Sequence, residues 1–277
     1  MLGTSIREAV ITCSDLSMTD YPKRLMPVGD VHARPGDSLD HLTWAGRMAA
    51  DHKVDTVLFL GDVGEFASCN PSLKPIEREG KRISEDIAAY KSTWHHFHDG
   101  IGFPTGDLPY EGVQANVQWI DGNHENYLEE LIKENPKFEG SFALHDAEDR
   151  KVFSDPAPFL QPIDVYGFSC RHYIPVDGNP KRAQNSETYK FKRSCIVGHS
   201  HQAVFRRDHD EHNNPIFFIN AGCWVSDEFY SLQQKHDYTY GSRCKWDRGL
   251  WLLDVVAPGQ VGHYSWWPYE KVKSCYA

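Results

Sequence analysis

The segment DTVLFLGD at residues 55–62 is an apolar run that stops at Gly-Asp, and RLMPVGD at residues 24–30 stops in the same way. Runs of this length, rich in Val, Leu and Phe and bounded by glycine, are typical of buried strands. A third run, VQWIDGN at residues 117–123, ends in Gly-Asn. The three segments predict buried strands that each carry a polar residue at the carboxyl end.

Further apolar runs and helical patterns extend this interpretation over most of the chain. The other predicted strands are residues 164–170, 194–199, 215–224 and 250–256. Apolar residues at helical spacing predict helices over residues 38–53, 76–97 and 124–133. Strands that alternate with helices predict an α/β fold with a largely parallel core. Residues 202–218 predict a hairpin that turns in the polar stretch 208–214.

The composition is that of a globular protein. The chain has 277 residues, of which 40% are hydrophobic and 25% charged. Because it has neither repeats nor a low-complexity linker, we expect a single domain over residues 1–277. The stretch from Asp62 to Asn123 is longer than one crossover helix needs. We therefore expect insertions at about residues 64–116 and 175–193.

The charge balance and the apolar segments limit the classes of partner. A net charge of −10 argues against an extended nucleic-acid surface, which needs basic residues to neutralise phosphates. No run approaches the ~20 apolar residues of a membrane span, and the N-terminus lacks the pattern of a signal peptide. The seven cysteines contain no Cys-x-x-Cys pair and predict reduced, buried thiols. We expect a cytoplasmic protein without a membrane partner, and we infer no obligate protein partner.

Metal-ligating and proton-transferring residues gather at the ends of the predicted strands. In open α/β sheets, ligands bind outside the carboxyl ends of the strands. The residues found there are Asp30, His32, Asp62, Asn123, His124, His172, His199 and His201. A single Asp or Asn after a strand usually caps a helix or forms a turn, but the combination with histidines predicts a metal site.

Five motifs in this order resemble the calcineurin-like metallophosphoesterases. They are GDVH at 29–32, GD at 61–62, GNHE at 122–125, the single His172 within CRHYIP at 170–175, and GHSH at 198–201. The resemblance runs from about residue 24 to residue 225 and includes NAG at 220–222, and GDVGEF after the second strand resembles phage and prophage members. It implies a metallophosphoesterase-like β-sandwich flanked by helices in αββα layers, with the active site at the carboxyl ends of strands.

The resemblance also implies two divalent metal ions. One would be held by Asp30, His32 and His201, the other by Asn123, His172 and His199, and Asp62 would bridge both. Imidazole, carboxylate and amide ligands without a thiolate suit Mn, Fe or Zn better than Mg. His172 has the shortest motif, and His145 is its nearest competitor. Two divalent cations outweigh the two carboxylates, so the site would attract a phosphate anion.

The implied reaction is hydrolysis of a phosphate-ester substrate by attack of a metal-bridging hydroxide on phosphorus. His124 would protonate the leaving oxygen, and Glu125 would orient or tune His124. Arg34 is a candidate phosphate contact. Basic residues in the two insertions predict a positively charged rim that would admit a nucleotide or the end of a nucleic acid.

Several alternatives stay open at the level of sequence. Among enzymes, a phosphodiesterase or nuclease competes with a phosphomonoesterase and with a Ser/Thr protein phosphatase, which GNHE also resembles. A non-catalytic metal-binding scaffold on the same fold is the alternative from another class. The remaining clustered histidines predict solvated surface positions: His95, His96 and His98 on a helix, and His209 and His212 in the hairpin turn.

Overall fold

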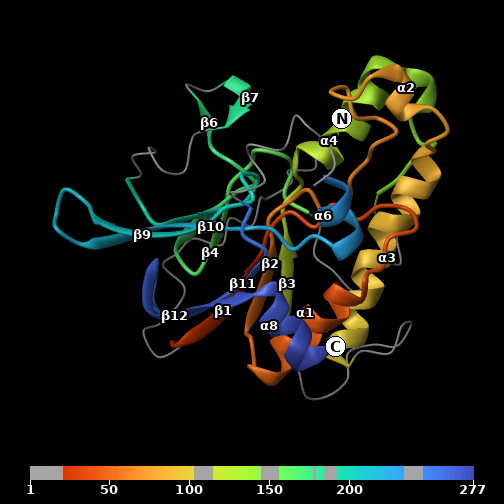
Figure 1. Cartoon of the computed structure of the whole chain (residues 1–277). Coiled ribbons are helices and arrows are strands. Elements are labelled where there is room, and N and C mark those ends of the chain that lie inside the picture. Colours follow the sequence, from red (N-terminus) through yellow and green to blue (C-terminus); the bar gives the residue numbers. More distant parts are fainter. Residues whose placement is uncertain (1–20, 103–114, 145–155, 177–178, 184–191, 234–245) are drawn as a thin grey trace, which may run out of the picture.

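The computed structural model describes residues 21–102, 115–144, 156–176, 179–183, 192–233 and 246–277. The described chain forms an α/β fold with two mixed five-stranded sheets (Figure 1). In spatial order, the first sheet contains β12 (Gln260–Pro268), β11 (Gly249–Ala257), β1 (Lys23–Val28), β2 (Thr56–Phe59) and β3 (Asn116–Trp119). The second contains β4 (Ile163–Val165), β5 (Phe168–Cys170), β8 (Cys195–Val197), β10 (Pro215–Ala221) and β9 (Ala203–His209).

Helices and a small hairpin complete the described fold. They are α1 (Asp40–Asp51), α2 (Pro75–Arg78), α3 (Ile83–Ile101), α4 (Asn123–Glu134), the 3₁₀ turn η2 (Pro136–Phe138), α6 (Asp227–Gln233), α8 (Tyr269–Tyr276) and the hairpin of β6 (Pro175–Val176) and β7 (Asn179–Ala183). Before α1, Ser38 Oγ accepts a hydrogen bond from the Asp40 backbone N–H at 3.2 Å. None of the helices in the described ranges has the length and apolar character needed to cross a membrane.

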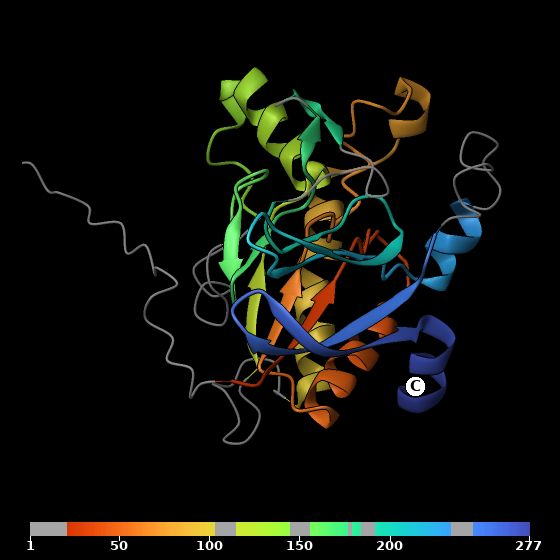
Figure 2. The ribbon, with the colours of Figure 1, turned by 90° about the vertical axis from the view of Figure 1, so that its left-hand side faces the viewer.

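Each sheet combines two parallel strand pairings with two antiparallel pairings. In the first sheet β1, β2 and β3 are parallel, β11 pairs antiparallel with β1, and β12 pairs antiparallel with β11. In the second, β5, β8 and β10 are parallel, and β4 and β9 run antiparallel. The predicted parallel core is thus confirmed for part of each sheet only. Figure 2 shows β1 and β2 running side by side toward the end of the molecule where α4 lies, and Asp30 and Asp62 follow their carboxyl ends.

Alternate residues of the first sheet face two different cores. Met26 and Val57 pack in a cluster with residues of α1, α3 and α8. Their neighbours Leu25 and Leu58 pack in a second cluster with Phe168 and other residues of the second sheet. Successive side chains of a strand point to opposite faces, which explains the division. The result is a layer of helices, then the first sheet, then the second sheet (Figure 1).

The outer face of the second sheet differs from the predicted αββα arrangement. It carries a small apolar cluster built on Cys195, Val197, Ile216 and Phe218. Within the described ranges, the buried members of this cluster come only from strands and not from a helix. The structure therefore describes one helical layer and two sheets of the four predicted layers.

Two predicted elements are divided in the structure. The strand predicted at 164–170 is the hairpin of β4 and β5, because Tyr166 and Gly167 adopt left-handed φ angles of 52° and 81° and reverse the chain. The helix predicted at 76–97 is interrupted between α2 and α3, where Gly80 has a φ of 80°. The hairpin predicted at 202–218 is confirmed by the antiparallel pairing of β9 with β10.

The described cysteines are free thiols, as predicted. Cys69, Cys170, Cys195 and Cys223 are buried. Cys275 near the C-terminus is exposed, contrary to the expectation of burial. Cys13 and Cys244 lie outside the described residues.

The prediction of a solvated surface is wrong for His98. This residue lies on the buried face of α3 beside the Phe97 ring, and it is 8% exposed. Burial, together with the nearby His95, lowers the pKa of His98 to about 4. His95 itself is exposed, and so are His209 at the end of β9 and His212 in the turn that follows.

Buried His98 is expected to make folding pH-dependent in the acidic range. The pKa of His98 is about 4 in the folded chain against 6.5 for an ordinary histidine, so protons bind preferentially to the unfolded chain. This stabilisation is complete above pH 6.5 and is lost as the pH falls toward 4, at about 1.4 kcal/mol per unit.

Urea unfolding at about pH 7.5 and about pH 5 measures the effect in wild type and His98→Gln. The variant should lose about 2 kcal/mol less stability on acidification than wild type. His95→Gln, on the exposed face of the same helix, should behave as wild type. Equal losses in all three proteins would show that His98 does not carry this dependence.

Candidate metal centre

Left-handed backbone turns the predicted ligands toward one another at the ends of β1, β2 and β8. The φ angles are 34° at Asp30, 52° at His32, 50° at Asp62, 69° at His199 and 56° at His201. Non-glycine residues rarely adopt this conformation, and it costs about 1–3 kcal/mol where it is strained. Five such residues in one place are a feature expected of a functional site rather than of ordinary turns.

Asp30, His32 and His201 form a first group of ligand atoms, which lie within 4.8 Å of one another. His32 Nδ1 donates to Glu65 Oε2 at 2.7 Å, so in the neutral ring Nε2 carries the free electron pair. This Nε2 lies 3.1 Å from His201 Nε2, which lies 3.5 Å from Asp30 Oδ1. Among the described residues, Asp30 Oδ1 finds no hydrogen-bond donor although it is buried. A cation would satisfy it.

His172, His199 and Asn123 form a second group. His172 Nδ1 donates to the Leu60 carbonyl oxygen at 2.6 Å, so in the neutral ring Nε2 carries the free electron pair. That Nε2 lies 2.9 Å from Asn123 Oδ1, 3.2 Å from His199 Nδ1 and 3.3 Å from Asp62 Oδ2. Ligand atoms that converge in this way fit a metal ion.

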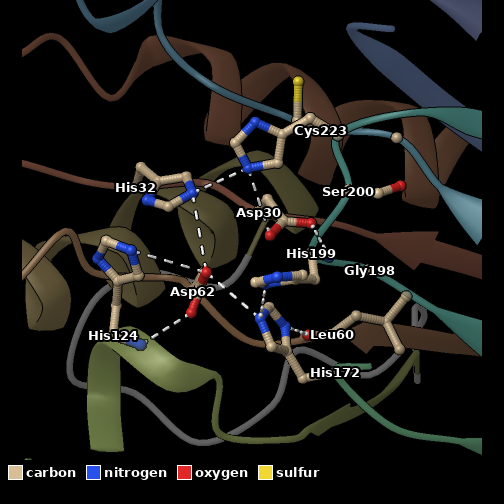
Figure 3. A network of polar contacts seen from close by, with 12 residues as sticks. Asp30, His32, Leu60, Asp62, His124, His172, Gly198, His199, Ser200 and Cys223 are labelled. Atoms are coloured by element: carbon tan, nitrogen blue, oxygen red, sulfur yellow. Dashed lines mark hydrogen bonds and ion pairs between the residues drawn. The ribbon is translucent and has the colours of Figure 1, made fainter. Parts of the chain in front are cut away.

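Asp62 connects the two groups through one of its oxygens. Oδ1 accepts a hydrogen bond from the His124 backbone N–H at 2.9 Å. Oδ2 lies 3.3 Å from His172 Nε2 and 3.9 Å from His32 Nε2, and Figure 3 shows this carboxylate between the histidines. One oxygen faces both groups, and the other holds the first turn of α4.

The electrostatics of the centre favour a bound cation. Burial opposes ionisation of Asp30 and Asp62, but neighbouring histidines hold the pKa of both carboxyls below its usual value. Burial also opposes protonation of His172, but Asp62 and Asp30 raise the pKa of His172 to about 9. At His199, burial and the adjacent His172 lower the pKa to about 4, which keeps this ring neutral. The same negative potential that attracts a proton to His172 attracts a metal ion.

The Glu125 carboxylate is held by backbone N–H groups rather than by the His124 ring, which was its predicted partner. Its carboxylate accepts backbone N–H groups from Gly122 at 2.8 Å, Asp62 at 2.9 Å and Gly64 at 2.9 Å. It is the third residue of α4 and reaches back to the residue before the helix, as a capping glutamate does. Glu125 thus clamps the loop after β2 to the start of α4 rather than orienting the His124 ring, and its charge adds to Asp62 and Glu65 in raising the pKa of His124.

The close approach of these two loops also depends on glycine. A Cβ on Gly61 would lie 2.6 Å from the Gly122 backbone and 2.8 Å from His172 Nδ1. Gly61 also has a φ of 88°, which side chains rarely allow. The glycines of GD and GNHE therefore let the loop that carries Asp62 pack on the loop that carries Asn123.

Glu65 is the site residue that the sequence did not single out. Its backbone carbonyl accepts a hydrogen bond from His124 Nδ1 at 2.5 Å, and its carboxylate lies 3.5 Å from the same nitrogen. Burial alone would lower the pKa of His124, but Asp62 and Glu65 outweigh it and raise that pKa. Glu65 therefore has the orienting role predicted for Glu125. A signal was present, because Glu65 is the only acidic residue of GDVGEF besides Asp62.

Arg34 lies beside the centre but already has an anionic partner. Its Nε and Nη2 donate to the two carboxylate oxygens of Asp37 at 2.9 and 2.8 Å. Its guanidinium covers the ring of Phe229, and that ring stacks on His32 with centroids 5.1 Å apart. A direct contact between Arg34 and phosphate stays a prediction.

Two basic residues of the second predicted insertion lie away from this centre. Lys192 and Arg193 lie before the amino end of β8, whereas His199 follows its carboxyl end. Arg193 donates to Ser169 Oγ at 2.7 Å. The remaining predicted rim residues are Lys74 directly before α2, Arg78 at the end of α2, Lys81 and Arg82 between α2 and α3, Lys91 on α3, and Lys181, Arg182 and Lys190, whose side chains lie outside the described residues, as does His145.

No protein-family model matches the chain, and no curated protein matches it. Fold and site define an α/β protein with buried Asp and His clusters that are able to bind metal ions.

Proposed function

We propose that this chain is a metal-dependent phosphoesterase of the calcineurin-like type, which hydrolyses phosphate esters with two divalent cations. One observation carries the proposal. Two groups of ligand atoms share Asp62 Oδ2, and the His124 ring lies beside that shared atom with Nε2 at 3.9 Å. A shared carboxylate between two cations, next to a proton donor, is the arrangement that in-line phosphoester hydrolysis requires.

The ligands divide between two cations. Asp30, His32 and His201 would hold one, Asn123, His172 and His199 the other, and Asp62 both. When bound, divalent cations lower the pKa of water and offset negative charge on phosphate oxygens. The protein's own part is to fix the imidazole rings. Glu65 and the Leu60 carbonyl accept the Nδ1 protons of His32 and His172, so that each ring presents Nε2 to the centre.

His124 is the residue that would move a proton. The Glu65 carbonyl accepts its Nδ1 proton, so Nε2 is the nitrogen that faces the centre and would deliver a proton to the leaving oxygen. Asn123, His124, His199 and Ser200 are partly exposed, whereas Asp30 and His172 are fully buried. A substrate would therefore enter on the side of His124, where a leaving group can meet it.

Removal and return of metal tests the proposal. Protein stripped with a chelator should hydrolyse neither bis-p-nitrophenyl phosphate nor p-nitrophenyl phosphate, and added Mn²⁺ should restore turnover. The ratio of the two rates distinguishes a phosphodiesterase or nuclease, which would act on nucleotidic esters, from a phosphomonoesterase or protein phosphatase. Protein that retains metal but hydrolyses neither ester would favour the non-catalytic scaffold and contradict the proposal.

A further inference from the structure

Tyr127 lies one turn after Asn123 on α4, and the two side chains are in contact. Asn123 Nδ2 donates to the Tyr127 hydroxyl oxygen at 3.1 Å, while Asn123 Oδ1 lies 2.9 Å from His172 Nε2. The Tyr127 ring also packs against the His124 ring, with centroids 5.0 Å apart. From one position, Tyr127 contacts both a candidate metal ligand and the candidate proton donor.

An asparagine side chain can bind a cation in only one of the two orientations of its carboxamide group. Its oxygen can bind a cation, whereas its NH₂ group is a donor and cannot. The two ends have nearly the same shape, so a half-turn of the carboxamide would direct N–H groups at the centre. The Tyr127 oxygen accepts a hydrogen bond from the nitrogen end, and this bond holds the carboxamide with Oδ1 toward His172. Groups that orient a ligand in this way commonly change metal affinity about 10–100-fold.

We propose that Tyr127 is a positioning residue whose hydroxyl fixes the Asn123 carboxamide and so determines the affinity of the second cation. The inference rests on the two-cation centre proposed above. None of the contacts described for the Tyr127 hydroxyl involves Asp30, His32 or His201, so the affinity for a cation held by those three residues should be unchanged.

Calorimetric titration of chelator-stripped protein with Mn²⁺ tests the inference without an activity assay. Wild type should bind two equivalents, and Tyr127→Phe should bind one of them about tenfold or more weakly. Phenylalanine keeps the ring against His124 and removes only the hydroxyl. The matched control is Tyr166→Phe, which removes a hydroxyl that bonds Thr56 Oγ1 at 2.7 Å, at the opposite end of β2 from Asp62. It should bind both equivalents as wild type does.

A double variant distinguishes loss of the carboxamide orientation from general damage to the structure. In Asn123→Asp, both ends of the side chain are ligand oxygens, so no orientation needs to be selected. Adding Tyr127→Phe to this variant should weaken binding by less than about threefold, against about tenfold in wild type.

The outcomes are distinct. Two equivalents bound with unchanged affinity in Tyr127→Phe would overturn the positioning role and leave the metal centre standing. If Tyr127→Phe lowered the Mn²⁺ affinity equally in the wild-type and Asn123→Asp backgrounds, the positioning role would also be overturned. A wild type that binds no Mn²⁺ would refute the centre itself and the inference with it.

Discussion

Replacing Asp62 with asparagine is expected to lower metal-dependent phosphoesterase activity about 10³-fold or more, equivalent to about 4 kcal/mol of transition-state stabilisation. Asp62 Oδ2 is the atom that lies near both His172 Nε2 and His32 Nε2. Asparagine can still accept the His124 backbone N–H through its oxygen, but its NH₂ group would then occupy the shared position. The change therefore removes a negative charge and directs donors at both cations.

Steady-state rates with saturating Mn²⁺, together with bound-metal content, measure this effect. Asp254→Asn is the control, because that carboxylate pairs with Arg24 Nε at 2.7 Å on β1, away from the metal centre. It should retain both activity and metal. A fully active Asp62→Asn variant would show that Asp62 does not link two catalytic cations.

Replacing His124 with glutamine is expected to slow hydrolysis by an amount that depends on the leaving group. For a phenyl ester, whose leaving oxygen needs a proton, the loss should be about 10²–10⁴-fold. For the p-nitrophenyl ester of the same phosphate, the leaving oxygen is weakly basic and the loss should be about tenfold at most. The reason is geometric, because Nδ1 bonds the Glu65 carbonyl and only Nε2 faces the centre.

The comparison of the two esters isolates proton transfer from metal binding. His124→Gln should keep its full metal content, since neither ligand group requires the His124 side chain. His263→Gln, on the exposed part of β12, should hydrolyse both esters as wild type does. Equal losses on the two esters would show that His124 is not the proton donor.

The positions of the ligands were predictable because their signals are local. An apolar run that ends in Gly-Asp identifies both a strand and the residue that follows it, as at Asp30 and Asp62. The structure brings these two residues together with the predicted asparagine and histidines, including His172, whose motif is a single residue. The α/β class and the hairpin of β9 and β10 follow from patterns of the same local kind.

The roles of the supporting residues depend on contacts that sequence spacing does not reveal. Glu125 stands next to His124 in the chain, yet its carboxylate turns back to Gly122 and the loop after β2. Glu65 is 59 residues from His124 and still accepts its Nδ1 proton, because the loop after β2 packs on the start of α4. Burial of His98 likewise depends on which face of α3 meets the sheet.

Breaks within predicted elements and an edge strand of the first sheet were also hard to predict. Gly80 and Gly167 divide a predicted helix and a predicted strand, since their left-handed φ angles reverse or break regular structure that the apolar pattern would continue. The edge strand β12 was not predicted, because it is only partly buried and lacks a continuous apolar run.

The anomalous diffraction of crystals grown with Mn²⁺ tests the two-cation centre most directly. We expect two peaks, one among Asp30, His32 and His201 and the other among Asn123, His172 and His199, with Asp62 in contact with both. A single peak, or none at these residues, would contradict the proposed centre.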